Sequence, residues 1–264
     1  MKLRGKVVWI TGASSGIGEA LALAYARAGA SVALSARRPG ELERVAATLP
    51  RKTRSLSVPL DVADLEAIPD RLAAIEASLG PVDVLVNNAG ISQRSLVTET
   101  SLETYRRIME IDFFATVALT QAVLPGMIAR RGGAIVVTSS VAGKLGTPLR
   151  SGYCAAKHAL HGFYDSLRAE VARDGLTVTL AVVGYVRTDV SLNALRGDGS
   201  AHAVMDPAQA AGLAPRVVAR RIVRAAARGK REVVVARGQS KFALTLARFA
   251  PSLLARVVTL RRAP

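Results

Sequence analysis

The stretch VVWITGASSGIGEALALAYARAGA (residues 7–30) determines the fold class. A run of apolar and β-branched residues leads into a glycine-rich turn, and an alanine- and leucine-rich stretch with helical spacing follows. Gly12, Gly16 and Gly18 have the spacing G-x-x-x-G-x-G, which differs from the commoner G-x-G-x-x-G. Glycines in such a turn let the backbone approach a pyrophosphate, and the N-terminus of the next helix attracts the anion. The stretch therefore predicts a strand, a phosphate-binding turn and a helix.

Strand-like apolar runs alternate with helical stretches along the chain. The runs cover residues 6–11, 31–36, 54–62, 82–89, 133–140, 176–184 and 231–236. The helical stretches cover residues 18–29, 41–49, 64–80, 102–131, a segment around Tyr153, and 215–229. This alternation predicts an α/β fold with a doubly wound, mostly parallel, seven-stranded sheet of the Rossmann-like type. We expect one domain over residues 1–236 and a helical tail over residues 237–264.

The composition restricts the class of protein. Of the 264 residues, 50% are hydrophobic and only 4% are aromatic, which suits helices packed on a buried parallel sheet. The net charge of +16 fits an anionic cofactor, substrate or membrane surface, and equally an arginine-rich background. Because the charges are scattered and few aromatic residues lie beside them, we expect no nucleic-acid partner.

The cysteine and histidine content predicts neither a disulfide nor a metal site. Cys154 is the only cysteine, so no intrachain disulfide can form. His158 and His161 share a helix face, and we interpret them as surface or interface residues. The N-terminal residues lack the apolar core of a signal peptide, and no apolar run reaches about 18 residues, so we expect a cytoplasmic protein.

The end of the second predicted strand bears on cofactor choice. In NAD-binding sheets an acidic residue at this position binds the ribose 2′-hydroxyl. Here the sequence is LSARR, with Ala36 at that position and Arg37 and Arg38 after it. Two arginines without the acid favour NADP(H) over NAD(H), and the alternative is an ordinary basic loop.

Tyr153 and Lys157 lie four positions apart in a helical stretch, SGYCAAKHAL (residues 151–160). Positions i and i+4 share a helix face, so the ammonium can lie near the phenol and favour its ionised form. Such a phenol can transfer a proton near neutral pH. The alternative is an amphipathic helix with a half-buried tyrosine and a lysine that extends along the surface.

Four motifs together decide between these alternatives. T-G-x-x-x-G-x-G (11–18), N-N-A-G (87–90), Y-x-x-x-K (153–157) and Ser140, thirteen residues before the tyrosine, occur in this order. The chain thereby resembles the short-chain dehydrogenase/reductases over about residues 5–236. The resemblance implies that Tyr153 is the general acid/base, that Lys157 assists it and binds the nicotinamide ribose, and that Ser140 binds the substrate oxygen. Sugar-nucleotide epimerases share Y-x-x-x-K, but their glycine spacing fits less well.

The same resemblance implies a cofactor site along the carboxyl edge of the sheet. Together with Arg37 and Arg38 at the end of the second strand, the predicted cofactor residues are Thr11, Gly12, Ser14, Ser15, Gly16, Ile17, Gly18, Asp61, Val62, Asn87, Ala89, Gly90, Tyr153, Lys157, Gly184, Val186 and Thr188.

The chain departs from the family pattern at two positions. Asp112 replaces a catalytic asparagine, and Val183 replaces a proline, which frees a backbone N–H and loosens φ near the expected nicotinamide carboxamide. The charge of Asp112 would oppose phenolate formation by about 2 kcal/mol and favour carbonyl reduction, and the effect is smaller if Asp112 is protonated or paired with Lys157. We still expect an active oxidoreductase that transfers hydride between NADP(H) and a carbonyl or secondary alcohol. The alternative is a cofactor-sensing regulatory protein on the same scaffold.

Residues 189–214 are rich in glycine, alanine and serine, and lie where a lid would close over the substrate. Leu192, Leu195, Val204 and Met205 would give that lid an apolar lining. They favour a bulky, lipid-like or steroid-like substrate, which Ser140 and Tyr153 would also contact; an ordinary surface loop is the alternative.

The tail KFALTLARFAPSLLARVVTL (residues 241–260) combines a wide apolar face with a narrow basic and polar stripe, and Pro251 should kink or split it. This pattern fits an interfacial membrane helix. It fits equally a helix that packs on its own domain or on a second subunit. The family resemblance implies a homodimer or homotetramer.

Overall fold

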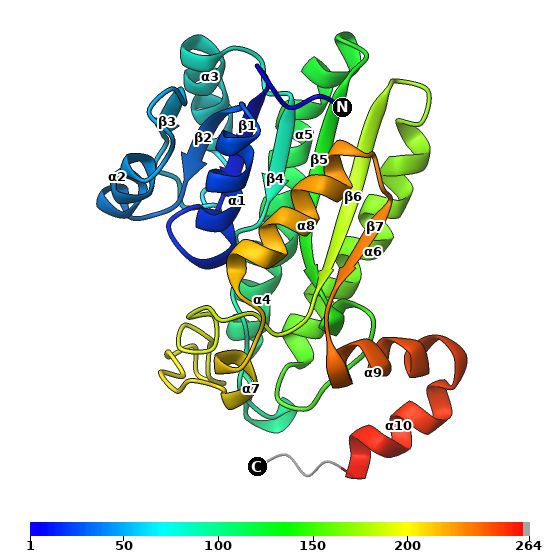
Figure 1. The fold of residues 1–264 in the computed structure, drawn as a ribbon. Coiled ribbons are helices and arrows are strands. Elements are labelled where there is room, and N and C mark those ends of the chain that lie inside the picture. Colours follow the sequence, from blue (N-terminus) through cyan, green and yellow to red (C-terminus); the bar gives the residue numbers. More distant parts are fainter. Residues whose placement is uncertain (261–264) are drawn as a thin grey trace.

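The computed structural model describes residues 1–260, with a seven-stranded parallel sheet at its centre (Figure 1). The strand order is β3-β2-β1-β4-β5-β6-β7. The strands are β1 (Val7–Thr11), β2 (Ser31–Ser35), β3 (Ser55–Ser57), β4 (Val84–Asn87), β5 (Gly133–Ser140), β6 (Leu176–Val183) and β7 (Glu232–Val235). The predicted doubly wound α/β fold is confirmed.

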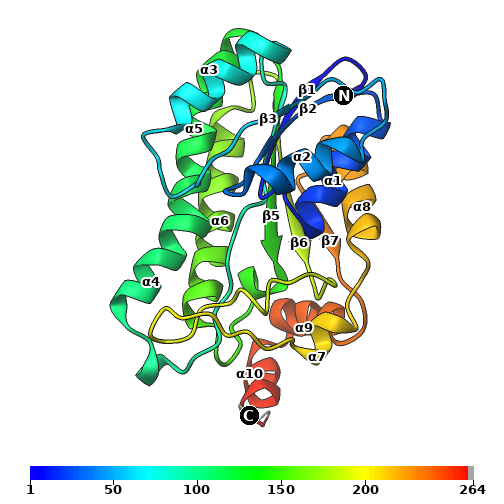
Figure 2. The same cartoon turned by 90° about the vertical axis from the view of Figure 1, so that its left-hand side faces the viewer.

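Helices cover both faces of the sheet (Figure 2). On one face lie α1 (Gly16–Arg27), α2 (Pro39–Ala47) and α8 (Pro215–Ala227). On the other lie α3 (Ile68–Leu79), α5 (Ala115–Ala129) and α6 (Ser151–Glu170). Val8 and Ile10 of β1 pack in the first core, and Val7 and Trp9 pack in the second. Burial on both faces explains why the strands are continuous apolar runs.

The third strand is much shorter than the predicted 54–62. Only Ser55–Ser57 forms a regular ladder with β2, although the Val58 N–H still donates to the Leu34 carbonyl at 2.8 Å. The hydrogen bonding to β2 continues past Pro59, because the Leu60 N–H donates to the Ala36 carbonyl at 3.1 Å. Pro59 itself faces the open edge of the sheet, where its missing N–H costs no ladder hydrogen bond.

The helical stretch 102–131 contains an irregular turn. It consists of α4 (Leu102–Met109), a π-helical turn η2 (Glu110–Phe114) and α5. Of residues 1–260, only Leu102–Ala129 is long and apolar enough to cross a membrane by length and composition, and 44% of its most apolar window is buried. Contacts with α3 and α6 identify this stretch as a core element.

The remaining elements gather at the carboxyl ends of the strands (Figures 1 and 2). They are η1 (Val97–Glu99), η3 (Val141–Gly143), α7 (Pro207–Ala210), α9 (Gly238–Phe249) and α10 (Pro251–Leu260). Pro251 splits the tail as predicted, because Ala250 leaves the helical region at φ −145° and ψ 61°. Residues 261–264 of the predicted tail lie outside the described residues.

Candidate active site

A cavity of about 1340 Å³ lies at the carboxyl ends of the strands. β1 is followed by a helix on one face and its neighbour β4 by helices on the other, so the chain connections diverge between these two strands. Such a divergence is the usual ligand crevice of a doubly wound sheet. The cavity extends from the glycine-rich turn after β1 to α9 and α10.

The glycine-rich turn has the geometry that only glycine permits. Gly12 and Gly16 have φ of +65° and +58°, and a Cβ on Gly18 would lie 2.0 Å from the Gly12 carbonyl oxygen. The turn lines the cavity with Gly12, Ser14, Ser15, Gly16 and Ile17. Within residues 1–260 the Ser15 side chain does not cap α1, so the first N–H groups of this helix remain for an anion.

Thr11 and Gly18 support this turn and do not line the cavity. The Thr11 hydroxyl accepts hydrogen bonds from the Asn88 and Ala89 N–H groups at 3.1 and 3.2 Å. The Asn88 amide in turn donates to the Thr11 carbonyl at 3.1 Å, and it accepts from Thr138. Asn88 therefore joins β1, β4 and β5, a role that the motif N-N-A-G did not reveal.

The side chain of Asn87 points away from the cavity. It is buried and donates to Thr120 Oγ1 at 3.1 Å and to the Tyr164 hydroxyl at 2.9 Å. It fixes α5 and α6 to β4 instead of lying along a cofactor. Its neighbours Ala89 and Gly90 do line the cavity.

The ends of β2 and β3 form the wall beside the glycine turn. Ala36, Arg37, Arg38, Asp61 and Val62 all line the cavity. Both arginines are exposed, and Asp61 accepts a hydrogen bond from the Ala63 N–H at 3.1 Å. Open helical N–H groups, glycines and two cations suit a dinucleotide, so the residues present fit the predicted cofactor.

Tyr153, Lys157 and Ser140 meet in the same cavity wall. The Lys157 ammonium lies 5.6 Å from the centroid of the Tyr153 ring, because the two residues are one turn apart in α6. Ser140 ends β5, and its hydroxyl oxygen accepts from the Ala142 N–H at 3.1 Å. The hydroxyl proton of Ser140 is therefore available for a substrate oxygen.

Asp112 forms a buried ion pair with Lys157. Its Oδ2 lies 3.1 Å from Lys157 Nζ, and the two side chains are 0% and 6% exposed. Asp112 Oδ1 accepts from the Ile91 N–H at 2.7 Å. Burial raises the pKa of Asp112 despite the opposing effect of Lys157. Burial alone would lower the pKa of Lys157, but the charges of Asp112 and Tyr153 raise it, so the lysine keeps its proton.

The π-helical turn η2 carries the buried Asp112. Turns of this kind are frequent at functional sites. A Cβ on Gly90 would lie 3.2 to 3.3 Å from both Asp112 carboxylate oxygens and from Lys157 Nζ, so glycine leaves room for the pair. Of the two states that would reduce the effect of the Asp112 charge, protonation and pairing with Lys157, the structure shows the pairing.

Val183 does not leave the backbone loose, contrary to the prediction. It pairs with Ser140 on one side and with Val235 on the other, so the sheet fixes its conformation. Gly184, Val186 and Thr188 follow it into the cavity lining.

Thr188 also reaches the opposite side of the crevice. A Cβ on Gly16 would lie 2.9 Å from Thr188 Cγ2, and Gln209 Nε2 donates to Thr188 Oγ1 at 3.0 Å. Gln209 was not among the site residues predicted from the sequence.

Residues 189–210 form the far wall of the cavity, mostly without regular structure. Leu192, Val204 and Met205 line it, as expected, whereas Leu195 does not. Leu195 instead forms β-bridges to Gln93 and to Ala201.

Four further polar residues of this wall were not predicted, because residues distant in sequence form it. They are Arg94, Arg150, Tyr185 and Asp206.

His161 is buried within the chain, which corrects its interpretation as a surface or interface residue; His158 is exposed. His161 Nε2 lies 3.0 Å from Ser139 Oγ. Burial and Lys144 lower the pKa of His161 to about 4, so it is neutral at physiological pH. Within residues 1–260, no group of three or more histidine, cysteine or acidic residues could hold a metal.

Comparison with known proteins agrees with this geometry. The short chain dehydrogenase family matches residues 6–198. The chain therefore belongs to the short-chain dehydrogenases, oxidoreductases that use a nicotinamide cofactor.

Its relatives include the dehydrogenase/reductase SDR family protein 7-like of Anopheles gambiae, 46% identical over 258 residues, which cover 95% of this chain and 81% of that protein. The dehydrogenase/reductase SDR family member 7B of Bos taurus is 41% identical, over 98% of this chain and 82% of that protein.

Two solved structures share the fold. A short-chain dehydrogenase from Streptomyces avermitilis has a TM-score of 0.79 and 33% identity, and 96% of each chain is covered. A short chain dehydrogenase/reductase from Burkholderia phymatum, in complex with NAD, has a TM-score of 0.83 and 24% identity over 100% of this chain and 98% of that chain.

Proposed function

We propose that the protein is an NADP(H)-dependent reductase of carbonyl compounds, with Tyr153 as the general acid. One observation carries the proposal. Lys157, buried and paired with Asp112, lies beside Tyr153 in the wall of a cavity that also contains a phosphate-binding turn. A cofactor sensor without catalysis would have no need for this arrangement.

The proposed mechanism assigns one task to each side chain. The bound nicotinamide supplies the hydride for the carbonyl carbon. As negative charge develops on the carbonyl oxygen, Tyr153 donates its proton to that oxygen. The Ser140 hydroxyl donates a hydrogen bond to the same oxygen, and the Lys157 ammonium stabilises the phenolate that Tyr153 leaves.

Asp112 sets the favoured direction in this proposal. Its carboxylate offsets part of the positive charge of Lys157, and this weakens the stabilisation of a phenolate at Tyr153. A tyrosine that keeps its proton is a ready donor for carbonyl reduction. We therefore propose reduction as the main reaction near neutral pH.

Arg37 and Arg38 support the choice of NADP(H). They line the cavity at the end of β2, where Ala36 stands in place of an acidic residue. A ribose 2′-phosphate would give these exposed cations a partner. The Burkholderia protein binds NAD, so the preference for NADP(H) depends on this basic pair.

The lining of the far wall supports a bulky, apolar substrate, lipid-like or steroid-like. Leu192, Val204 and Met205 of the proposed lid face the same cavity as Leu246 of α9 and Leu254 of α10. An apolar ligand of substantial size would bury these side chains on binding. Closure of residues 189–214 would then exclude water from the reaction.

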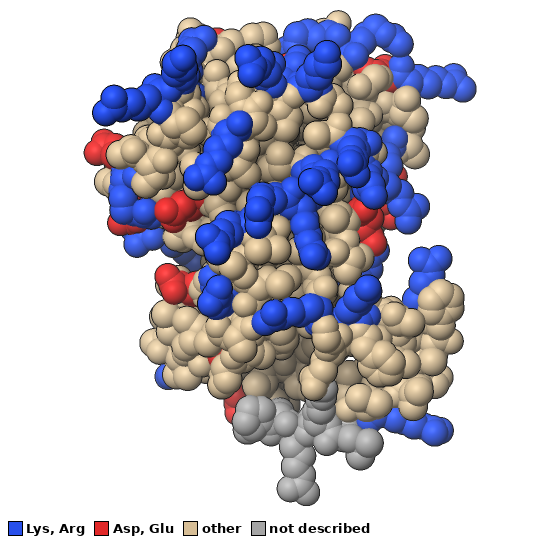
Figure 3. Space-filling model, viewed as in Figure 1, with Lys and Arg blue, Asp and Glu red and all other residues tan. Residues whose placement is uncertain are grey.

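We also propose that α9 and α10 contact an anionic membrane surface. α9 has no buried residue, and Phe242, Phe249 and Leu253 are 64%, 77% and 50% exposed. Figure 3 shows this part of the molecule as mostly uncharged, with basic groups at its edge and across the body. Lys241 and Arg248 could bind lipid headgroups while the apolar side chains insert.

We propose a cytoplasmic homodimer or homotetramer as the working form. Cys154 is a free, buried thiol, which suits a reducing compartment. Light scattering after size exclusion measures the oligomeric state directly.

The proposed reaction is tested with NADPH and a chain-length series of methyl ketones, followed by the loss of NADPH absorbance. We expect turnover, and kcat/KM that rises with the apolar size of the ketone. NADH at the same concentration is the control and should be the poorer donor. Absence of NADPH oxidation with every ketone would overturn the proposed reaction.

The membrane contact is tested by flotation with vesicles of phosphatidylserine and phosphatidylcholine. The full chain should float at low salt, and a chain truncated after Gln239 should not. Flotation of both chains, or of neither, would contradict the assignment to α9 and α10.

A further inference from the structure

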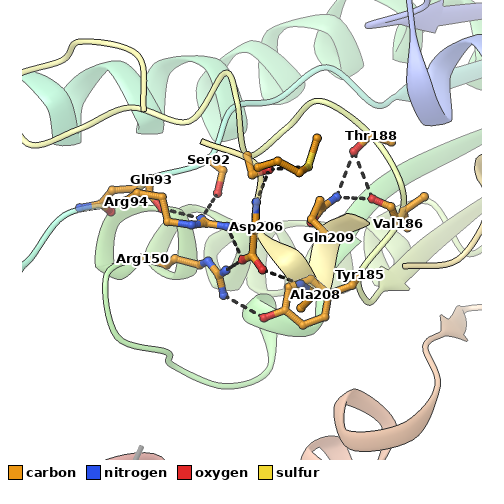
Figure 4. A network of polar contacts seen from close by, with 12 residues as sticks. Ser92, Gln93, Arg94, Arg150, Tyr185, Val186, Thr188, Asp206, Ala208 and Gln209 are labelled. Atoms are coloured by element: carbon orange, nitrogen blue, oxygen red, sulfur yellow. Dashed lines mark hydrogen bonds and ion pairs between the residues drawn. The ribbon is translucent and has the colours of Figure 1, made fainter. Parts of the chain in front are cut away.

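Two arginines converge on one carboxylate at the lid side of the cavity (Figure 4). Asp206 Oδ2 accepts from Arg150 Nη2 at 2.8 Å and from Arg94 Nη2 at 3.1 Å. Arg94 follows β4, Arg150 is the N-cap residue of α6, and Asp206 is the N-cap residue of α7. Three segments that are distant in sequence therefore build this cluster.

The cluster carries a surplus positive charge although it is mostly shielded from solvent. The side chains of Arg94, Arg150 and Asp206 are only 9%, 17% and 21% exposed. Burial and the neighbouring Arg150 lower the pKa of Arg94. Burial alone would raise the pKa of Asp206, but the Ala208 N–H and both arginines lower it, so the acid is ionised. One carboxylate thus faces two guanidinium groups.

Other acidic groups do not balance this charge. Asp189 also lines the cavity, but it is exposed, and among residues 1–260 only Asp206 lies within ion-pair distance of either arginine. His202 lines the same wall, and burial together with Arg94 lowers its pKa. The electrostatic environment of this wall is therefore positive.

The two guanidinium groups also have hydrogen-bonding capacity to spare. Arg94 Nη1 donates to Ser92 Oγ at 3.1 Å and to the Gln93 carbonyl at 2.7 Å. Arg150 Nη1 donates to the Tyr185 hydroxyl at 3.3 Å. With the two bonds to Asp206, the hydrogen bonds of the described residues use half of the ten N–H donors that two arginines supply.

We propose that Arg94 and Arg150 bind an anionic group of the substrate, a carboxylate or a phosphate monoester. This inference rests on the proposed function and defines its substrate as an acidic carbonyl compound with an apolar body. Arg150 lies three residues before Tyr153 at the start of α6, so the anion and the carbonyl bind in one cavity. The apolar remainder lies along α9 and α10.

The carboxylate of Asp206, bound by both guanidinium groups, shows that Arg94 and Arg150 can bind an anion together. Because Asp206 shares the arginines with the incoming group, its charge weakens the binding of that group. Asp206 therefore tunes the affinity of the site, and its removal should strengthen anion binding. If Asp206 only held the lid in place, its removal would not strengthen the binding of anions.

The first test compares octanoate, octyl phosphate and 1-octanol by calorimetric titration into the full chain with bound NADP⁺. We expect the parent to bind at least one of the two anions about ten- to a hundredfold more tightly than the alcohol. Arg94→Met and Arg150→Met should each lose most of this preference. Arg220 is an exposed arginine on α8. The control Arg220→Met removes the same charge and should leave the preference for anions unchanged.

The second test is Asp206→Asn, which keeps the shape and the cap of α7. It should strengthen binding of the anion by about three- to tenfold and leave 1-octanol unchanged. Equal changes for all three probes would assign Asp206 to the lid alone. If Arg94→Met or Arg150→Met does not fold, the comparison of Asp206→Asn with the parent decides whether anions bind at this site.

These titrations need no turnover, so they are separate from the test of the reaction. Reduction of neutral ketones without any preference for the anions would overturn this inference and keep the proposed function. A preference for octanoate identifies a carboxylate site, and one for octyl phosphate identifies a phosphate site. A preference that survives both arginine substitutions would overturn the assignment.

Discussion

Two charged clusters beside one cavity differ in how deeply their side chains are buried and in the ratio of positive to negative groups. Lys157 and Asp112 form a one-to-one pair that is 6% and 0% exposed. Arg94 and Arg150 share only Asp206, and these three side chains are 9% to 21% exposed. An unpaired charge is very costly at full burial, and the cost falls as water or a ligand can reach the group. The deep cluster is therefore suited to hold one arrangement, and the shallow cluster to accept a further ion.

Arg37 provides a third case, a charged side chain that is exposed to solvent. It lines the cavity, and among residues 1–260 no acidic side chain lies within ion-pair distance of it. Solvent compensates such a charge at little cost. The three sites therefore predict different consequences when one charged group is removed.

The largest effect should come from breaking the deep pair. Asp112→Ala leaves Lys157 buried without a counter-ion, and we expect a loss of about 3–5 kcal/mol in the free energy of unfolding. The matched variant Asp206→Ala loses a cap and partly exposed ion pairs, and should cost about 1–2 kcal/mol. Urea denaturation measures both, and equal losses would contradict the comparison.

Arg37→Ala tests the exposed site. Loss of a charge-assisted contact to a 2′-phosphate should weaken the binding of NADPH by about 1.5–3 kcal/mol, which raises its dissociation constant roughly ten- to a hundredfold. Binding of NADH should change little, because it lacks that phosphate. Titration of both cofactors is the measurement, with Arg220→Ala as control, and equal weakening would place Arg37 elsewhere in the cofactor site.

Asp112→Asn separates charge from shape in the deep cluster. The uncharged amide would leave the Lys157 ammonium uncompensated, and this favours the phenolate needed for alcohol oxidation. The rising limb of kcat/KM for oxidation should move to lower pH by about one unit. Asp206→Asn should leave the limb in place, and an upward shift in Asp112→Asn would contradict the role given to Asp112.

His161 should give the smallest effect, because it is a buried group held neutral. Its pKa of about 4 lies below the unfolded value of about 6.5. Between these values the unfolded chain binds a proton that the folded chain does not, so stability falls as pH falls from about 6.5 towards 4. His161→Gln should reduce the loss of unfolding free energy between pH 7.5 and 5 by less than about 1 kcal/mol, measured by urea denaturation at the two pH values. His158→Gln is the control, and an unchanged pH dependence in His161→Gln would contradict this prediction.

The sequence predicted the sheet, and it predicted residues such as Tyr153 and Lys157 that the structure brings together in one cavity, because local patterns encode both. Glycine spacing, apolar runs and the interval from Tyr153 to Lys157 each depend on neighbouring residues. The cluster around Asp206 was missed because Arg94 lies 112 residues from it and only the fold unites them. The inward orientation of Asn87 and the π-helical turn at Asp112 likewise depend on packing against other elements.

The central claim is that Tyr153 supplies the proton for carbonyl reduction. Tyr153→Phe removes that proton and keeps the ring beside Lys157. With a ketone that the parent reduces, kcat should fall by about two orders of magnitude or more, while the dissociation constant of NADPH changes by less than about twofold. Turnover within a few-fold of the parent would show that the proton comes from another group, and would contradict the account.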